Sequence, residues 1–193
     1  MRVVLASGSP QRREILQKLG LEFEVVVPGV EELSEGDPEC LVVENARRKA
    51  EAVEAGAGDL VIACDTDVVL DGQVLGKPAD AREAREYLDR MSGRPHTVMS
   101  GLIVWDRTHL LPHTGNKYVR SGLEKTTVVF KELSAAEKER YVRFGEWEGR
   151  SGGYAIQTLG STLVERVEGS VSNVVGLPVG LLAELAPELL ERG

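Results

Sequence analysis

Serine and arginine side chains gather where the first predicted strand turns into a helix. The segment Ser7-Gly-Ser-Pro-Gln-Arg-Arg13 follows a short apolar run. A helix N-terminus presents free backbone N–H groups and a partial positive charge, so it can bind an anion. Ser7 adds a hydroxyl group, and Arg12 and Arg13 add guanidinium groups that can bind phosphate through paired hydrogen bonds. These residues fit a phosphate site and a capped surface helix with solvated arginines about equally well.

Two aspartates follow a buried strand predicted over Leu60–Cys64, in the order Asp65-Thr66-Asp67. Ligands of open α/β sheets collect at the carboxyl ends of strands. One or two carboxylates beside substrate phosphates are the usual protein ligands of Mg²⁺. An aspartate at a strand end is also common in turns and helix caps. Asp65, directly after the apolar run, is therefore the stronger functional candidate, and Asp67 is as readily structural.

Two glycine-containing segments could bring a ligand close to the backbone. Gly72-Gln-Val-Leu-Gly-Lys-Pro78 is not a P-loop, because three residues separate its glycines where four are required. Its Lys77 still offers a single phosphate contact, with a solvated turn lysine as the alternative. Gly152-Gly-Tyr-Ala-Ile-Gln157 ends in an amide that can pair with a nucleobase edge, although glycine loops of this kind are usually turns.

Strands and helices alternate in the first half of the chain, and strands cluster in its middle. This order predicts an α/β fold with a mixed sheet. The predicted strands are 2–6, 23–27, 60–64, a hairpin over 68–75, 97–105, 125–130 and two short strands before Pro178. A polar loop is expected over 107–116. The predicted helices are 10–19, 38–55, 80–91, 134–144 and one amphipathic helix after Pro178.

The composition is that of an ordinary globular chain of 193 residues, 42% hydrophobic and 28% charged, with a net charge of −8. Such a chain lacks the broad basic face that a nucleic acid polymer or an anionic membrane requires. Its apolar runs of about five residues fall short of the roughly 20 that span a bilayer. Cys40 and Cys64 form no CxxC pair, which favours neither a disulfide nor a zinc site. We expect a cytoplasmic protein, and a small polyanionic substrate stays compatible with its charge.

Taken together, the motifs resemble those of the Maf family of nucleoside triphosphate pyrophosphatases. The resemblance runs almost end to end, through LASGSPQRREIL, the acidic pair in Val30-Glu31-Glu32, ENARRKA, ACDTDVVLDGQVLGKP, SGRPHTV, GGYAIQ and NVVGLP. It implies one Maf-like domain over residues 1–193, with two lobes around a central cleft. The implied fold is an elongated α/β structure with a curved mixed sheet flanked by helices, similar to the inosine triphosphate pyrophosphatases.

The resemblance also implies an activity and roles for individual residues. The family hydrolyses the α–β phosphoanhydride bond of nucleoside triphosphates with a divalent metal, Mg²⁺ or Mn²⁺. Asp65 becomes the general base or metal-linked carboxylate, and Glu32 becomes its partner at the metal. The implied ligands of the triphosphate are Ser7, Arg12, Lys49 and Lys77.

Three further positions bear on substrate specificity. Thr66 and the Ile-Gln pair that ends at Gln157 are similar to the family branch that acts on dTTP, UTP and modified pyrimidine nucleotides. Gln11 stands where that branch usually has arginine and where a 7-methyl-GTP-directed branch has tryptophan. We expect the dTTP/UTP preference. The alternatives are the 7-methyl-GTP activity and a regulatory module of cell division that binds nucleotide without turnover; the oligomeric state is open, a homodimer included.

Overall fold

The computed structural model describes residues 2–110 and 117–190, and these form seven strands, seven α-helices and two 3₁₀ helices. The strands are β1 (Val3–Ala6), β2 (Glu24–Val26), β3 (Leu60–Leu70), β4 (Gln73–Leu75), β5 (Pro95–Leu110), β6 (Lys117–Phe130) and β7 (Val164–Glu168). The α-helices are α1 (Pro10–Lys18), α2 (Pro38–Ala52), α3 (Ala81–Met91), α4 (Ala135–Phe144), α5 (Val171–Val175), α6 (Val179–Leu185) and α7 (Pro187–Leu190). The 3₁₀ helices are η1 (Ser151–Gly153) and η2 (Thr158–Thr162).

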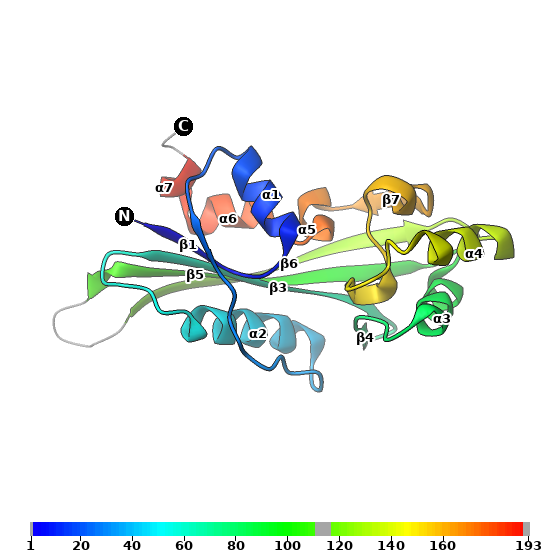
Figure 1. Cartoon of the computed structure of the whole chain (residues 1–193), viewed down its shortest axis with the longest axis horizontal. Coiled ribbons are helices and arrows are strands. Elements are labelled where there is room, and N and C mark those ends of the chain that lie inside the picture. The colour runs from blue at the N-terminus through cyan, green and yellow to red at the C-terminus, as the bar shows by residue number, and fades with distance from the viewer. Residues whose placement is uncertain (1, 111–116, 191–193) are drawn as a thin grey trace. The chain divides into compact units, whose positions relative to one another are not determined.

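The strands form one mixed sheet in the order β2-β1-β3-β5-β6-β7, and β4 pairs with β3 off this path. β1 runs parallel to both β2 and β3, whereas the β3–β4 and β6–β7 pairs are antiparallel. Helices flank the sheet (Figure 1). The predicted α/β class with a mixed sheet is confirmed. Within the described residues, no helix combines the length and apolar character needed to cross a membrane.

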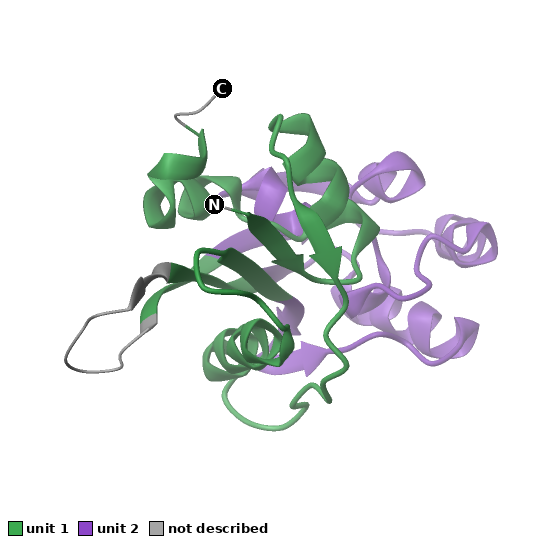
Figure 2. Ribbon diagram, turned by 60° about the vertical axis from the view of Figure 1, so that its left-hand side comes forward, with its two compact units in different colours: residues 1–65, 100–124, 176–193 green, residues 66–99, 125–175 purple. Residues whose placement is uncertain are grey.

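The chain divides into two compact units (Figure 2). Unit 1 comprises residues 1–65, 100–124 and 176–193, and unit 2 comprises residues 66–99 and 125–175. Among the described residues, unit 1 contains two clusters of buried apolar side chains and unit 2 contains one. The single domain with two lobes around a cleft stays a prediction.

The strands of unit 1 separate two apolar layers, because successive side chains along a strand point to opposite faces. The layer against α1, α6 and α7 includes Leu5, Ile62, Leu16, Leu182 and Leu189. The layer against α2 includes Val4, Val61, Ala46, Ala50 and Ile103. Figure 1 shows α2 on one side of these strands and α1, α6 and α7 on the other. Helix α2 is thereby held against the sheet along its length.

Helices α1, α2 and α4 begin at residues whose side chains cap the helix. Ser9 accepts a hydrogen bond from the backbone of Arg12 at the start of α1, and Pro10 takes the first turn. Asp37 caps α2 in the same way. Ser134 and Glu137 form a capping box at the start of α4.

Strand β3 is longer than predicted. We expected a strand ending at Cys64 and a separate hairpin, but one strand runs unbroken to Leu70. Its last residues pair with β4, with Val68 opposite Leu75. The polar residues between are accommodated because they have partners, such as Ser151, whose hydroxyl donates to Asp67 at 3.0 Å. Asp65 therefore lies within a strand rather than after one.

The strands around the expected polar loop also extend further. β5 continues to Leu110 and β6 begins at Lys117, and the remaining predicted loop residues, 111–116, lie outside the described residues. Arg107 stays extended because its backbone N–H donates to the Asp59 carbonyl at 2.9 Å and its carbonyl accepts from Gly58 at 3.2 Å. Backbone hydrogen bonds of this kind cannot be predicted from the polarity of the side chains.

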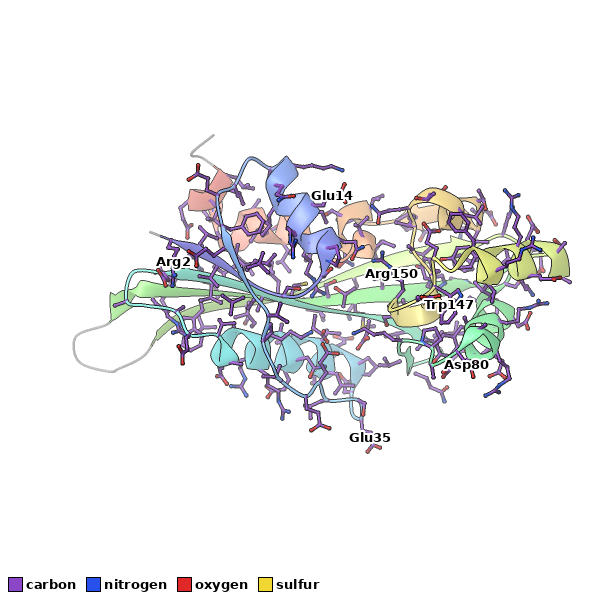
Figure 3. The ribbon with its side chains drawn as sticks, viewed as in Figure 1. Arg2, Glu14, Glu35, Asp80, Trp147 and Arg150 are labelled. Atoms are coloured by element: carbon purple, nitrogen blue, oxygen red, sulfur yellow. The ribbon has the colours of Figure 1, made fainter. Side chains whose placement is uncertain are left out.

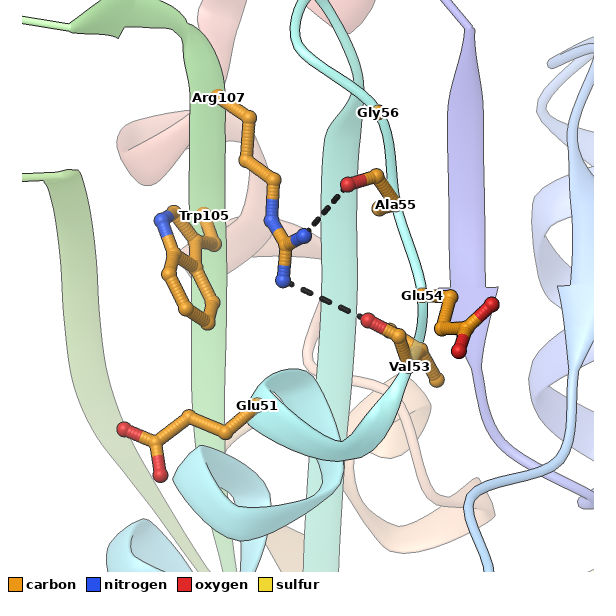
Figure 4. A pocket seen from close by; sticks show the side chains of 7 residues that line it. All are labelled: Glu51, Val53, Glu54, Ala55, Gly56, Trp105 and Arg107. Carbon is orange, nitrogen blue, oxygen red and sulfur yellow. Dashed lines mark hydrogen bonds between the residues drawn. The ribbon is translucent and has the colours of Figure 1, made fainter.

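Helix α2 ends at Ala52 rather than near Ala55. The Arg107 guanidinium donates to the carbonyls of Ala55 at 2.6 Å and Val53 at 3.4 Å, and it lies over the Trp105 ring, 4.3 Å from its centroid (Figure 4). These carbonyls thereby have partners outside the helix. The same residues, with Glu51, Glu54 and Gly56, line a surface hollow of about 700 Å³.

Two predictions for the last third of the chain were wrong. One strand, β7, replaces the two expected before Pro178, and the Val171–Val175 segment is helix α5. Ser170 favours this helix because its hydroxyl accepts from the Asn173 backbone N–H at 3.3 Å. The C-terminal helix is interrupted at Ala186, where Pro187 begins α7, since proline cannot continue the hydrogen bonding of a helix interior.

Gly101 allows the backbone of α2 to pack closely against the sheet. A Cβ atom at this position would overlap the backbone carbonyl of Val42 and press on the backbone nitrogen of Val43. We expect Gly101→Ala to lower the free energy of unfolding by about 1–3 kcal/mol or more, since backbone cannot move aside as a side chain can. Urea unfolding measures this loss. Gly180→Ala, in α6 with open space around it, is the control, and equal losses in both variants would contradict the prediction.

His96 makes stability depend on pH in unit 2. Its ring is buried, its Nε2 lies 2.8 Å from the Tyr154 hydroxyl, and its Nδ1 has no hydrogen-bond partner in the described part of the chain. Burial lowers the pKa of His96 from 6.5 to about 4. Between these values the unfolded chain binds a proton that the folded chain does not, so stability falls as pH falls through this window. The expected loss by pH 4 is about 3 kcal/mol.

Unfolding free energies measured from neutral pH down to pH 4 check this expectation, and His96→Gln should flatten the slope. Glu137→Gln is the matched control. Lys131 and Ser134 lower the pKa of Glu137 from 4.5 to about 2, so its effect belongs to a lower pH range. A slope that persists unchanged in His96→Gln would assign the dependence to other groups.

Candidate active site

The predicted serine directly follows β1, and the predicted aspartate lies on the neighbouring strand β3. β1 and β3 run parallel with Leu5 opposite Ile62. Ser7 comes two residues after Leu5, and Asp65 comes three after Ile62. Both side chains are buried. The register therefore places both residues near the end of β1, while β3 continues beyond them.

Lys49 joins the two predicted metal carboxylates. Its Nζ lies 2.5 Å from Glu32 Oε1 and 2.5 Å from Asp65 Oδ1. The lysine is buried on the face of α2 that packs against the strands, and Glu32 comes from the loop after β2. One positive charge thus stands between two negative charges, which offsets their repulsion. Three residues that the resemblance grouped together are in contact.

Asn45, which the sequence analysis did not single out, completes this cluster. Its Nδ2 donates to Asp65 Oδ2 at 3.1 Å and to the Leu33 carbonyl at 3.0 Å, and its Oδ1 accepts from the Leu33 N–H at 2.7 Å. The signal was present in ENARRKA, where Asn45 precedes Lys49 by four residues and so shares its helix face. We refer to Glu32, Asn45, Lys49 and Asp65 as the carboxylate cluster.

Arg12 is turned inward rather than solvated. Its Nε donates to the Gly176 carbonyl at 2.8 Å and its Nη1 donates to Ser7 Oγ at 3.2 Å. The same carbonyl of Gly176 accepts from the Cys64 thiol at 3.5 Å, and Cys64 directly precedes Asp65. The Ser7–Arg12 pair and the carboxylate cluster are thereby linked through one backbone carbonyl.

Two other cations near the N-terminus are engaged in ion pairs of their own. Arg2 Nη2 lies 2.6 Å from Asp59 Oδ2, and Lys18 Nζ lies 2.6 Å from Glu14 Oε1. Figure 3 labels Arg2 at the start of β1 and Glu14 on α1. Among the cations of this segment, Arg12 contacts the predicted site residue Ser7.

The four remaining predicted site residues are divided between the two units. Gln11 is half-buried on α1, and its Oε1 accepts from the Ser9 hydroxyl at 3.1 Å. Thr66, Lys77 and Gln157 belong to unit 2, where Thr66 and Gln157 are half-buried and Lys77 is exposed. The Lys77 turn adjoins the glycine segment, because Gly152 N–H donates to the Gly76 carbonyl at 3.0 Å. Contacts of these four residues with a substrate stay predictions.

Glu32 and Asp65 suit a hard divalent cation. Their oxygens already converge on one positive group, the Lys49 ammonium. Mg²⁺ takes one or two carboxylates and completes its shell with waters and substrate phosphates. In the part of the chain that the structure describes, no group of three or more His, Cys, Asp or Glu side chains could hold a metal ion. Glu32 and Asp65 are therefore two described carboxylates that could hold such a cation together with waters and substrate phosphates.

Known proteins resemble this chain over nearly its whole length. The family model described as Maf-like protein matches residues 2–189. A "dTTP/UTP pyrophosphatase" of Deinococcus radiodurans is 46% identical over 186 residues, which cover 95% of this chain and 91% of the relative. A "dTTP/UTP pyrophosphatase" of Thermus thermophilus is 47% identical over 180 residues, which cover 92% of this chain and 89% of the relative.

Two solved structures are more distantly similar. The Ham1 protein of Staphylococcus aureus is 16% identical with a TM-score of 0.43, over 67% of this chain and 72% of that one. A HAM1 protein of Coxiella burnetii is 16% identical with a TM-score of 0.47, over 97% of this chain and 99% of that one. The match of the family model and the identity to curated relatives decide the assignment: the chain belongs to the Maf-like protein family.

Proposed function

We propose that this chain hydrolyses the α–β phosphoanhydride bond of dTTP, UTP and modified pyrimidine nucleoside triphosphates, releasing nucleoside monophosphate and pyrophosphate. The single observation that carries the proposal is the Lys49 bridge between Glu32 and Asp65. The curated relatives named dTTP/UTP pyrophosphatase support it. Retained carboxylates favour an enzyme over a module that only binds nucleotide, because binding alone needs no group that activates water.

In this proposal the residues of unit 1 act on different parts of the reaction. Asp65 orients a water molecule for attack on the α-phosphorus and takes its proton, while the bond from the α-phosphorus to the bridging oxygen breaks and pyrophosphate leaves. Ser7 and Arg12 hold phosphate oxygens by hydrogen bonds, and Lys49 adds positive charge. A divalent cation held by Glu32 and Asp65 would offset the charge that develops on the leaving group.

Other roles are proposed from the resemblance alone. Lys77 binds the triphosphate, and Gln11, Thr66 and Gln157 set the choice of base. A cytoplasmic location and a possible second copy of the chain in a homodimer stay predictions, as does the absence of nucleic acid or membrane partners.

The proposal is tested by pyrophosphate release from dTTP, UTP, CTP, modified pyrimidine nucleotides and 7-methyl-GTP, each with Mg²⁺ and with Mn²⁺. Highest kcat/KM for dTTP and UTP supports it. A preference for 7-methyl-GTP would move the chain to the other substrate class. No release from any nucleotide, with nucleotide binding retained, would support the regulatory module.

A further inference from the structure

Asn45 uses its whole side-chain amide in the carboxylate cluster. One Nδ2 hydrogen goes to Asp65 Oδ2 and the other to the Leu33 carbonyl, while Oδ1 accepts from the Leu33 N–H. The residue is buried, with 2% of its surface exposed, so little solvent competes for these bonds. The paired bonds to Leu33 hold the backbone of the residue that directly follows Glu32. One amide thus holds both the aspartate and the loop that carries the glutamate.

We infer that Asn45 is a positioning residue, which fixes Asp65 and the Glu32 loop so that Asp65 Oδ1 and Glu32 Oε1 converge on one point. The inference rests on the proposed function for its effect on turnover. Because Oδ2 of Asp65 is occupied by the amide, Oδ1 is the oxygen that faces Lys49. The amide thereby selects which oxygen of the aspartate is directed to the reacting groups.

Lys49 cannot supply this geometry. An ammonium is a point charge on a flexible stem with rotating donors, so it attracts both carboxylates without fixing the plane of either. A planar amide makes bonds in set directions. If Lys49 turns toward a substrate phosphate, the bonds of Asn45 still hold Asp65 and the Leu33 backbone in place. Asn45 thus supplies direction and Lys49 supplies charge to the same carboxylate, which explains why both residues occupy one face of α2.

Two variants separate the parts of this role. Asn45→Leu keeps the number and branching of the side-chain heavy atoms and removes all three hydrogen bonds. Asn45→Asp keeps an acceptor for the Leu33 N–H but loses both donors and places a second carboxylate against Asp65. We expect kcat to fall about 10–100-fold in both, the usual cost of removing such an outer partner. KM should change less than kcat, because Ser7 and Arg12 are untouched.

The matched control is Asn173→Leu. Asn173 is also fully buried and donates to the Val98 carbonyl at 3.1 Å and to Thr126 Oγ1 at 3.0 Å. Neither of these two hydrogen bonds involves a residue of the carboxylate cluster. We expect this variant to lose stability while its kcat, measured well below its unfolding temperature, stays close to that of the unchanged protein.

Hydrogen–deuterium exchange gives a reading that does not depend on turnover. Peptides covering residues 28–36 should exchange faster in Asn45→Leu, because the Leu33 N–H loses its acceptor, and should stay protected in Asn173→Leu. Normal kcat in Asn45→Leu, a KM defect alone, or equal exchange in both leucine variants would overturn the inference. If the unchanged protein releases no pyrophosphate, the proposed function fails, and the exchange comparison by itself decides whether Asn45 holds the loop.

Discussion

Asp65→Asn is expected to lower kcat for pyrophosphate release by about 10²–10⁴-fold, the range typical of a lost general base. The substitution preserves shape but removes the negative charge that orients and deprotonates water. Lys49 and Asn45 each donate a hydrogen bond to one oxygen of the Asp65 carboxylate. In Asp65→Asn, the new amide NH₂ group would face one of these donors and could not accept its hydrogen. KM should rise less than kcat falls, since the groups of Ser7 and Arg12 remain.

Asp67→Asn is the control for the Asp65 prediction. Asp67 is the same residue type two positions along β3, and its Oδ1 accepts from the Ser151 hydroxyl at 3.0 Å. Turnover in this variant should be close to normal. Steady-state measurement of pyrophosphate release over a range of dTTP concentrations gives kcat and KM for each variant. Retention of a tenth or more of the activity in Asp65→Asn would remove Asp65 from the chemical step.

Lys49→Met should cost about 3–5 kcal/mol of stability, the usual effect of removing one partner of a buried ion pair. Asp65 would keep the Asn45 bond but lose its positive partner, and Glu32 would repel it. At about 2–4 °C per kcal/mol for a chain of this size, the unfolding temperature falls by about 6–20 °C. We expect Mg²⁺ to restore more stability to this variant than to the unchanged protein, because a divalent cation can stand where the ammonium stood.

The neighbouring Arg48 supplies the control for the lysine variant. Its Nε lies 3.1 Å from Glu44 Oε1 on the exposed face of α2, and surface pairs of this kind contribute about 0–1 kcal/mol. Arg48→Met should therefore change little, with or without Mg²⁺. Thermal unfolding of the three proteins across a Mg²⁺ titration is the measurement. The same Mg²⁺ effect in all three would show that the cation does not replace Lys49 between the carboxylates.

The sequence predicted those parts of the site that local pattern determines. Ser7 and Arg12 stand out because a strand, a cap and a helix start follow one another, and Asp65 stands out against an apolar run. Lys49 and Glu32 could be placed only through the family resemblance. They come from segments distant in sequence from Asp65, and nothing local distinguishes Lys49 from a solvated helix lysine.

The errors share a physical cause, which is that tertiary partners override local preference. Arg107 looks like a loop residue, yet backbone bonds to Asp59 and Gly58 hold it in a strand. Val171–Val175 is rich in β-branched residues, yet the Ser170 cap begins a helix there. Asn45 was overlooked because a polar residue on a helix indicates nothing until the carboxylate and the backbone that it binds are known.

Asn45 and Lys49 stand four residues apart on α2, so the pitch of the helix sets the spacing between these two members of the carboxylate cluster. Each added residue turns an α-helix by about 100°. A single insertion between the two would therefore carry Lys49 away from Glu32 and Asp65 while leaving Asn45 in place. Substitutions on the outer face of this turn should be tolerated, but changes in its length should not. The segment from Asn45 to Lys49 is thus constrained in length more strictly than in composition.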